Sequence, residues 1–359
     1  SPNNIIVFLC VYYIIKLIRL AYDIIESMKD TSHTRPKLED VARLAGVSKT
    51  TVSRVLNNRG YLSEKTIQKV NDAMAALGYQ PNIIARQLFQ QKTYLVGLIF
   101  PTVNNPFFAQ LEAEMERLLY KRGYKVLMGN SQNDPDKEED YLKQLLTHQV
   151  DGLIVGAHNQ GLKEYSHHNL PIVSIDRIMN DDIPVVSSDN FQGGKLATER
   201  LLKRGCRYVV HTNGPLNLNT PAQQRRLAYE SVMEAHGLKP ITYHIDFNIS
   251  QEEKREVLRC IFEEHPLVDG IFASNDTDAA ILLSLAREYN REVPRDLKII
   301  GYDGADMTQL LLPHLSTIQQ PINQMAKTAV NLLENRMNGK VSQSNTHILP
   351  VKLLDNGTC

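Results

Sequence analysis

The sequence of 359 residues contains no tryptophan, and its charges cancel, with 40 basic and 40 acidic side chains. A chain without net charge has no overall field that would attract nucleic acid. Its four cysteines lie far apart and form no CxxC or Cys/His cluster: Cys10, Cys206, Cys260 and Cys359. This spacing argues against a zinc site and a disulfide framework, and it is typical of the reducing cytoplasm, where we expect the protein to be.

Enzyme signatures are also missing. The sequence contains no GxSxG, P-loop or HExxH motif, and the Gly193-Gly194 pair lacks the context of a dinucleotide site. We therefore expect neither an enzyme nor a bound cofactor or metal.

The longest uncharged apolar run, from Ile5 to Ile15, has eleven residues, whereas a membrane-spanning helix needs about 20. A longer span would have to include Lys16 and Arg19, so a membrane anchor is disfavoured. The run also lacks the basic start and cleavage site of a signal peptide. We interpret residues 1–35 as a leader of doubtful status, with 1–27 upstream of the working protein or a poorly determined helix.

The segment 38–58, LEDVARLAGVSKTTVSRVLNN, has the pattern of two short helices. Leu38, Val41, Ala42, Leu44 and Ala45 have the apolar spacing of a first helix. Gly46 suits a left-handed turn, and Ser48 is a good N-cap for a second helix whose buried stripe is Val52, Val55 and Leu56. A third helix, capped by Ser63 and ended by Gly78, would close a small helical domain over 36–81.

The second helix carries small polar and basic residues on its other face, including Lys49, Thr50 and Arg54. Between Arg35 and Lys92, ten basic residues stand against four acidic ones. This pattern favours a DNA-binding helix-turn-helix over an ordinary helical hairpin with a solvated face, although the segment alone leaves both interpretations open. Residues 82–92 form either a plain linker or a helix that requires a partner, because isolated helices this short are marginal in water.

From residue 93 to the C-terminus, continuous apolar strands alternate with amphipathic helices. Such alternation predicts parallel sheets covered on both faces, and the series restarts near Tyr208. The predicted fold class is therefore an N-terminal all-α three-helix domain, with the helix-turn-helix as the favoured interpretation, a connecting segment (82–92), and an α/β core (93–359) of two parallel-sheet lobes across a cleft.

Ligands of parallel sheets bind at the carboxyl ends of the strands. At those ends, and near the start of a helix beside them, lie polar and aromatic side chains suited to a polyhydroxylated ligand. Asp189 and Asp276 are more typical of helix N-caps. The side chains that we expect to contact a ligand are Asn105, Phe107, Asp176, Arg226, Asn275 and Asp303.

Segments spread in order from about Lys37 to Leu354, among them NNPFF, SIDR, SSDN and IGYD, resemble the LacI/GalR family of bacterial repressors. The resemblance is most specific in the helix-turn-helix and in LGYQPNIIARQL. The resemblance implies a homodimer that binds double-stranded operator DNA, a hinge helix that orders on the operator with Leu88 as a minor-groove wedge, and a periplasmic-binding-protein-like core. It also implies that a sugar effector binds the cleft residues named above. The DNA contacts it implies are Lys49, Thr50, Thr51, Ser53, Arg54, Asn57, Tyr61, Asn82, Ala85 and Leu88.

The effector expected from the resemblance is sucrose or a related sugar that releases the operator. Fructose, another disaccharide, a phosphorylated sugar, a purine or a corepressor protein remain alternatives. An extracytoplasmic sugar-binding receptor is the alternative from a different class, because the core alone would allow it. The helix-turn-helix, the unpaired cysteines and the missing cleavage site oppose that alternative.

Overall fold

The computed structural model describes residues 36–57, 59–80, 92–144, 147, 150–156, 159, 171–216, 218, 220–340 and 344–359. The predicted leader (1–35) and the predicted hinge, apart from Lys92, lie outside these residues. The chain divides into two compact units, residues 1–90 and 91–359, and each is described by itself. Among the described residues, no helix has the length and apolar character needed to cross a bilayer.

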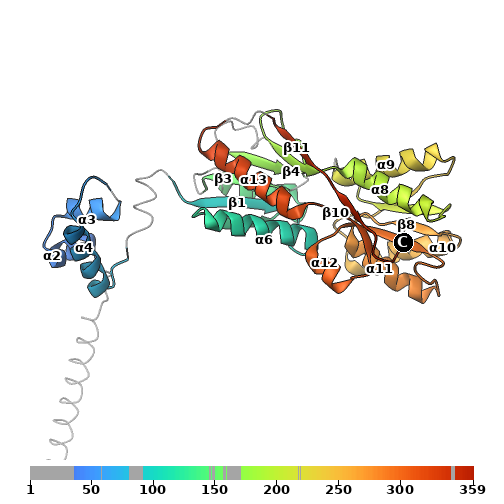
Figure 1. The fold of residues 1–359 in the computed structure, drawn as a ribbon, viewed down its shortest axis with the longest axis horizontal. Helices are drawn as coiled ribbons and strands as arrows, with labels where there is room; N and C mark the ends of the chain where they lie inside the picture. Colours follow the sequence, from blue (N-terminus) through green and yellow to red (C-terminus); the bar gives the residue numbers. More distant parts are fainter. Residues whose placement is uncertain are drawn as a thin grey trace, which may run out of the picture. The chain divides into compact units, whose positions relative to one another are not determined.

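The described part of the N-terminal unit contains three helices (Figure 1): α2 (Leu38–Ala45), α3 (Lys49–Leu56) and α4 (Glu64–Leu77). Gly46 ends α2 with φ +66°, a left-handed conformation that costs glycine little, and the chain turns directly into α3. Val41, Val52 and Val70, one from each helix, are fully buried and form the centre of a small shared core. The predicted helix pair and third helix are therefore present.

Leu44 is an exception to the predicted pattern, because 55% of its surface is exposed. The short helix α2 buries only the stripe formed by Val41, Ala42 and Ala45. Leu44 lies outside this stripe and remains mostly exposed.

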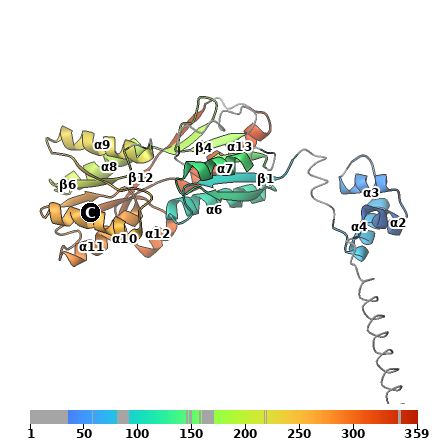
Figure 2. The ribbon, with the colours of Figure 1, turned by 180° about the vertical axis from the view of Figure 1, so that it is seen from behind.

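The first lobe of the core is a parallel six-stranded sheet in the order β11-β5-β4-β3-β1-β2. Helices α6 (Pro106–Lys121) and α13 (Ile322–Met337) pack side by side on one face, and α7 (Pro135–Gln144) packs against β2. Figure 2 shows α7 on the side of the sheet away from α13. The strands are β1 (Leu95–Phe100), β2 (Lys125–Asn130), β3 (Gly152–Val155), β4 (Ile172–Ile175), β5 (Val185–Ser188) and β11 (Thr346–Leu349).

The second lobe is also a six-stranded sheet, in the order β12-β10-β9-β8-β6-β7, and only β12 is antiparallel. Its strands are β6 (Val209–Asn213), β7 (Ile241–His244), β8 (Gly270–Phe272), β9 (Lys298–Asp303), β10 (Ser316–Gln319) and β12 (Lys352–Leu354). Its helices are α8 (Asn190–Lys203), α9 (Pro221–Ala235), α10 (Gln251–Glu264), α11 (Asp276–Glu288) and the short α12 (Asp306–Leu311). The predicted two-lobed α/β fold is confirmed.

The chain crosses between the lobes three times: from β5 to α8, from β10 to α13, and from β11 to β12. The last crossing divides the apolar segment 347–354, HILPVKLL. Pro350 interrupts it, since proline cannot donate to a strand ladder, and its two halves join different sheets. As a result, α8 packs in the second lobe and α13 in the first, so the lobes do not correspond to the two halves of the sequence.

Candidate functional site

Helix α3 presents the predicted recognition surface of the N-terminal unit. The Ser48 hydroxyl accepts a hydrogen bond from the Thr51 backbone N–H at 3.1 Å, which caps the helix. Because Val52 faces the core, Lys49, Thr50 and Arg54 are exposed, while Thr51 and Ser53 are half-buried. Tyr61 is 96% exposed in the loop that follows. The surface is small-polar and basic, as a helix that enters a major groove requires.

Two of these side chains have partners within the unit. Lys49 forms an exposed ion pair with Glu39 of α2, and the Arg54 Nε–H donates to the Arg59 carbonyl at 3.4 Å. Both contacts are exposed to solvent and therefore weak, so their exchange for a phosphate or a base costs little. Asn57 differs, because its amide donates back to the Ser53 carbonyl at 2.8 Å and is half-buried. The predicted contacts Asn82, Ala85 and Leu88 lie outside the described residues.

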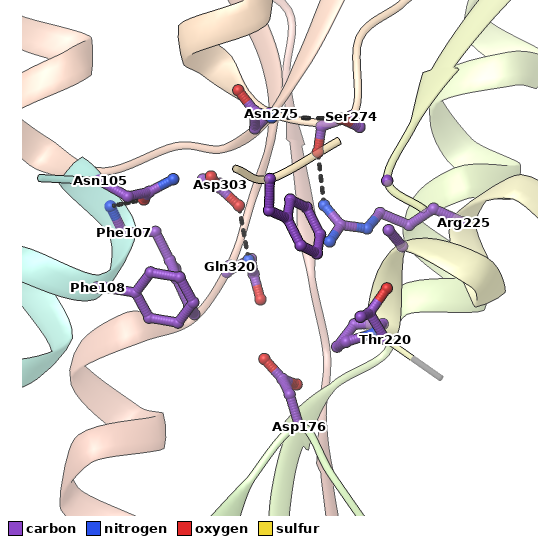
Figure 3. Close-up of a pocket in the computed structure, with 14 residues that line it drawn as sticks. Asn105, Phe107, Phe108, Asp176, Thr220, Arg225, Ser274, Asn275, Asp303 and Gln320 are labelled. Carbon is purple, nitrogen blue, oxygen red and sulfur yellow. Dashed lines mark hydrogen bonds between the residues drawn. The ribbon is translucent and has the colours of Figure 1, made fainter. Parts of the chain in front are cut away.

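In the core, a pocket of about 110 Å³ lies between the lobes (Figure 3). The structure brings five of the six predicted ligand residues to this pocket. They are Asn105, Phe107, Asp176, Asn275 and Asp303, and they are joined there by Phe108, Gly214, Thr220, Pro221, Ala222, Arg225, Phe247, Ser274 and Gln320. The lining combines carboxyl groups, amides, a guanidinium and aromatic rings, which suits a ligand rich in hydroxyl groups.

The sixth prediction, Arg226, is corrected by the structure. Arg226 lies outside the pocket lining and pairs with Glu230 at 2.6 Å along α9. Its neighbour Arg225 lines the pocket instead, donates to the Ser274 carbonyl at 2.6 Å, and lies 4.1 Å from the centroid of the Tyr302 ring. Successive residues of a helix point about 100° apart, so only one of two adjacent arginines can face the cleft.

The close approach of α8 to α9 fixes the position of Arg225. A Cβ atom at Gly194 would lie 2.5 Å from the Arg225 carbonyl oxygen, and one at Gly193 would lie 2.6 Å from the Tyr302 hydroxyl. Two consecutive glycines therefore allow α8 to contact both the backbone of Arg225 and the ring beneath its guanidinium. The Gly193-Gly194 pair is the feature of the sequence that could have indicated this close approach of two helices.

Asp176 and Asp303 supply the two carboxyl groups of the pocket from the ends of β4 and β9. Both have a left-handed backbone, with φ +59° and +105°, an uncommon conformation for a residue other than glycine that often marks a functional site. Burial raises the pKa of Asp303 to about 8 and that of Asp176 to about 6, although the Arg225 charge opposes both shifts. The Ser187 hydroxyl donates to Asp176 at 2.7 Å.

Asn105 and Asn275 combine two roles. The Asn105 side-chain oxygen accepts from the Phe107 N–H at 2.8 Å and caps α6, and that of Asn275 accepts from the Asp278 N–H at 2.8 Å and caps α11. Their oxygens are therefore engaged, and the Asn275 amide also donates to the Ser274 hydroxyl at 3.2 Å, so the remaining amide N–H groups are the donors that a ligand would meet.

The predicted caps Asp189 and Asp276 have different outcomes. Asp189 caps α8 by accepting from the Gln192 N–H at 3.0 Å. Asp276 does not cap α11, because Asn275 does. It is buried beneath the pocket and accepts from the Thr317 hydroxyl at 2.6 Å and the Gly304 N–H at 2.8 Å. Burial raises the pKa of Asp276 to about 7.

The pocket is linked to the crossing segments by a chain of side chains. Gln320, in the β10–α13 crossing, donates to Asp303 at 2.8 Å and accepts at 2.6 Å from Ser188, at the β5–α8 crossing. A ligand that contacts Asp303 is therefore one hydrogen bond away from the segments about which the lobes would move. Sequence reasoning missed Gln320 and Thr220, since neither stands at a strand end with a distinctive pattern.

The helix-turn-helix surface and the interlobe pocket define a class of protein in which a DNA-binding module is joined to a two-lobed ligand-binding core. Residues 37–82 match the bacterial regulatory proteins of the lacI family, and residues 198–359 match a periplasmic binding protein-like domain. The chain belongs to the lacI family of bacterial regulatory proteins.

Named relatives cover most of the chain. The sucrose operon repressors of Pediococcus pentosaceus and Streptococcus mutans are 43% and 44% identical to it, each over 89% of this chain and 98% of theirs. The ribose operon repressor of Halalkalibacterium halodurans is 38% identical over 88% of this chain and 95% of its own. Among solved structures, the lac repressor dimer bound to operator and an anti-inducer is 25% identical, with a TM-score of 0.79 over 90% of this chain and 99% of that one.

Proposed function

We propose that this protein is a transcriptional repressor of a sugar-utilisation operon, which binds its operator as a homodimer in the cytoplasm and is released by a sugar. The observation that carries the proposal is the position of the pocket. In this pocket the carboxyl group of Asp303 accepts a hydrogen bond from Gln320, which lies in one crossing segment. Gln320 in turn accepts a hydrogen bond from Ser188 at another crossing. A ligand held there can favour one arrangement of the lobes, and thereby one state of the segment that leads to the DNA-binding unit.

The DNA contacts are assigned to the exposed surface of α3. Thr50 and Thr51 would reach base edges, while Lys49 and Arg54 would exchange their weak exposed partners for bases or phosphates. Residues 82–92 would supply a hinge helix, in which Asn82, Ala85 and Leu88 contact the minor groove.

The effector is a sugar, with sucrose as the first candidate because of the two sucrose operon repressors at 43% and 44% identity. Ribose is the second candidate, because a ribose operon repressor is 38% identical over a similar length. The lining itself supports a neutral polyol, since carboxyl oxygens accept hydroxyl protons, and amide and guanidinium groups donate to hydroxyl oxygens.

A gel-shift titration on a palindromic operator, with and without sucrose or ribose, tests the proposal. We expect binding without sugar and at least about tenfold weaker binding with it, which corresponds to about 1.4 kcal/mol of coupling. Failure to shift any palindromic operator would refute the repressor function. Tighter operator binding in the presence of sugar would mean that the sugar acts as a corepressor and not as an inducer.

The hinge is tested separately by Leu88→Ser. We expect weaker specific operator binding and unchanged sugar affinity, because the substitution removes an apolar wedge of the hinge and no polar group of the pocket. Operator affinity and sugar affinity are measured on the same preparation. Unaltered operator affinity would show that residues 82–92 act only as a tether.

A further inference from the structure

A second cavity, of about 750 Å³, adjoins the pocket already described. The two share Asn105, Phe108, Phe247 and Asn275, so they are continuous. We call them the outer chamber and the inner pocket. Ligand sites typically measure about 300–1,000 Å³. The inner pocket of about 110 Å³ is too small for that range by itself, whereas the two spaces together fall within it.

The outer chamber is lined from both lobes. The loops after β1 and β2 supply Asn104 and Asn133, and the loop after β7 with the start of α10 supplies Asn248 and Gln251. Amide side chains offer both donors and acceptors without charge, which matches the hydroxyl groups of a sugar ring. Phe247, at the junction of the two spaces, adds an aromatic ring. The walls therefore have the same chemistry as a sugar site, but they are less charged than the inner pocket.

Charge argues against a phosphorylated ligand. Lys254 is the one charged side chain among the described residues of the outer chamber, and it is already paired with the buried Asp278 at 3.2 Å. The inner pocket contains the carboxyl groups of Asp176 and Asp303 against the single guanidinium of Arg225. A phosphate group would therefore meet no uncommitted cation in the described lining, and near neutral pH it would be repelled by the ionised carboxylate of Asp176.

Asn133 is the side chain of the outer chamber with the clearest unused bonding capacity. Its side-chain oxygen is buried and has no hydrogen-bond partner among the described residues. Asn133 and Gln132 are both left-handed, with φ +57° and +52°. The Gln132 oxygen accepts from Lys137 at 2.7 Å, so within this pair only Asn133 keeps its acceptor for a ligand. Buried acceptors are costly unless they are paired, which favours a ligand hydroxyl at this position.

We propose that the outer chamber is a second glycosyl subsite. In this arrangement, which rests on the proposed function, one ring of the effector occupies the inner pocket and an uncharged second ring occupies the outer chamber. Asn133 accepts a hydrogen bond from a hydroxyl of the second ring and determines specificity for a two-ring sugar. The effector class is thus a neutral disaccharide rather than a pentose or a sugar phosphate.

Isothermal titration of the full-length protein tests this proposal with sucrose, glucose, fructose, ribose and sucrose 6-phosphate. We expect sucrose to bind at least tenfold more tightly than each of the other four. A monosaccharide or the phosphate that binds as tightly as sucrose would overturn the second subsite, and the repressor proposal would stand. If no sugar in the panel binds or alters the gel shift, both proposals fail.

Two variants then locate the second ring. Asn133→Gly removes the carboxamide, while glycine keeps the left-handed backbone. It should weaken sucrose binding about tenfold and leave fructose and glucose affinities within twofold. Asn290→Gly is the matched control, because Asn290 has φ +52° but lies beyond the end of α11 and lines neither space.

Asn248→Trp places a large ring in the chamber from an exposed loop position. It should reduce sucrose affinity at least tenfold and spare the monosaccharides. Equal losses for sucrose and monosaccharides in both variants, with the control unchanged, would contradict a separate subsite.

Discussion

Replacing Arg225 by alanine should abolish the sugar response, whereas the same change at Arg226 should leave it intact. Arg225 donates a charged hydrogen bond to the Ser274 carbonyl at 2.6 Å and lies 4.1 Å from the centre of the Tyr302 ring. Arg226 contacts Glu230 and Gln223 on its own helix. The two residues are adjacent and chemically identical, so the pair of variants separates the role of position from the role of charge.

The magnitudes follow from these contacts. A hydrogen bond from a charged donor contributes about 1.5–3 kcal/mol, and a partly desolvated cation–π contact about 0.5–2 kcal/mol. Arg225→Ala should therefore lower the free energy of unfolding of the core by about 2–5 kcal/mol and sugar affinity by about 100-fold. Arg226→Ala removes an i,i+4 pair worth about 0.3–0.5 kcal/mol and no ligand contact.

The loss caused by Arg225→Ala should depend on pH. The Arg225 charge holds down the pKa values of Asp176 and Asp303, which burial raises to about 6 and about 8. Near pH 5 both carboxyl groups carry a proton, so they are only weakly stabilised by the guanidinium charge and removing it costs little. Above pH 8 both are ionised, and the loss of the cation costs most.

Denaturant unfolding and sugar titration of both variants at pH 5 and pH 8.5 check these expectations. Equal effects of the two substitutions, or a loss for Arg225→Ala that does not grow with pH, would refute the assignment of Arg225 to the pocket.

Three further substitutions test the Asp303 carboxyl, the recognition helix and the close contact between Gly304 and β10. The pKa of Asp303 is raised by burial to about 8, so its protonated form stabilises the fold fully below about pH 4, and that contribution is lost as pH rises toward 8. Asp303→Asn should therefore raise the unfolding free energy by about 3–4 kcal/mol more at pH 8 than at pH 5 while abolishing the sugar response; equal changes at the two pH values in denaturant unfolding would contradict it. Ser48→Ala removes the cap of α3 and should cost about 1 kcal/mol, seen as about fivefold faster amide exchange in α3, whereas unchanged exchange would show that the cap is dispensable. Gly304→Ala should lower the denaturation midpoint clearly more than Gly237→Ala; both glycines have positive φ, but a Cβ at Gly304 would lie 2.7 Å from Gln319 Cα, whereas one at Gly237 meets nothing within 4 Å.

The helix-turn-helix could be predicted from sequence in most details, because its signals are local. Gly46 ends one helix and Ser48 begins the next, and the apolar spacing identifies Val41 and Val52 as core residues. The prediction that Leu44 belongs to the buried stripe was wrong, because an eight-residue helix in this small unit has only one covered stripe.

The candidate pocket could be predicted in part. Asn105, Asp176, Asn275 and Asp303 stand at the carboxyl ends of buried strands, and parallel sheets bring those ends to the same edge. The choice between Arg225 and Arg226 depended on the rotation of α9 about its axis. Neighbours from α8 set that rotation, and a one-residue error in phase exchanges the two side chains.

By itself, the sequence determined the order of the helices and strands and the two-lobed α/β class, because periodicity and caps act over a few residues. The tertiary structure alone decided which elements belong to which lobe, through three crossings that exchange α8 and α13 and split 347–354 at Pro350. It also decided that Gln320 joins Asp303 to Ser188, and that the outer chamber adjoins the inner pocket. The bond between Ser188 and Gln320 links residues 132 positions apart in the chain, and only the packing of whole lobes brings such residues together.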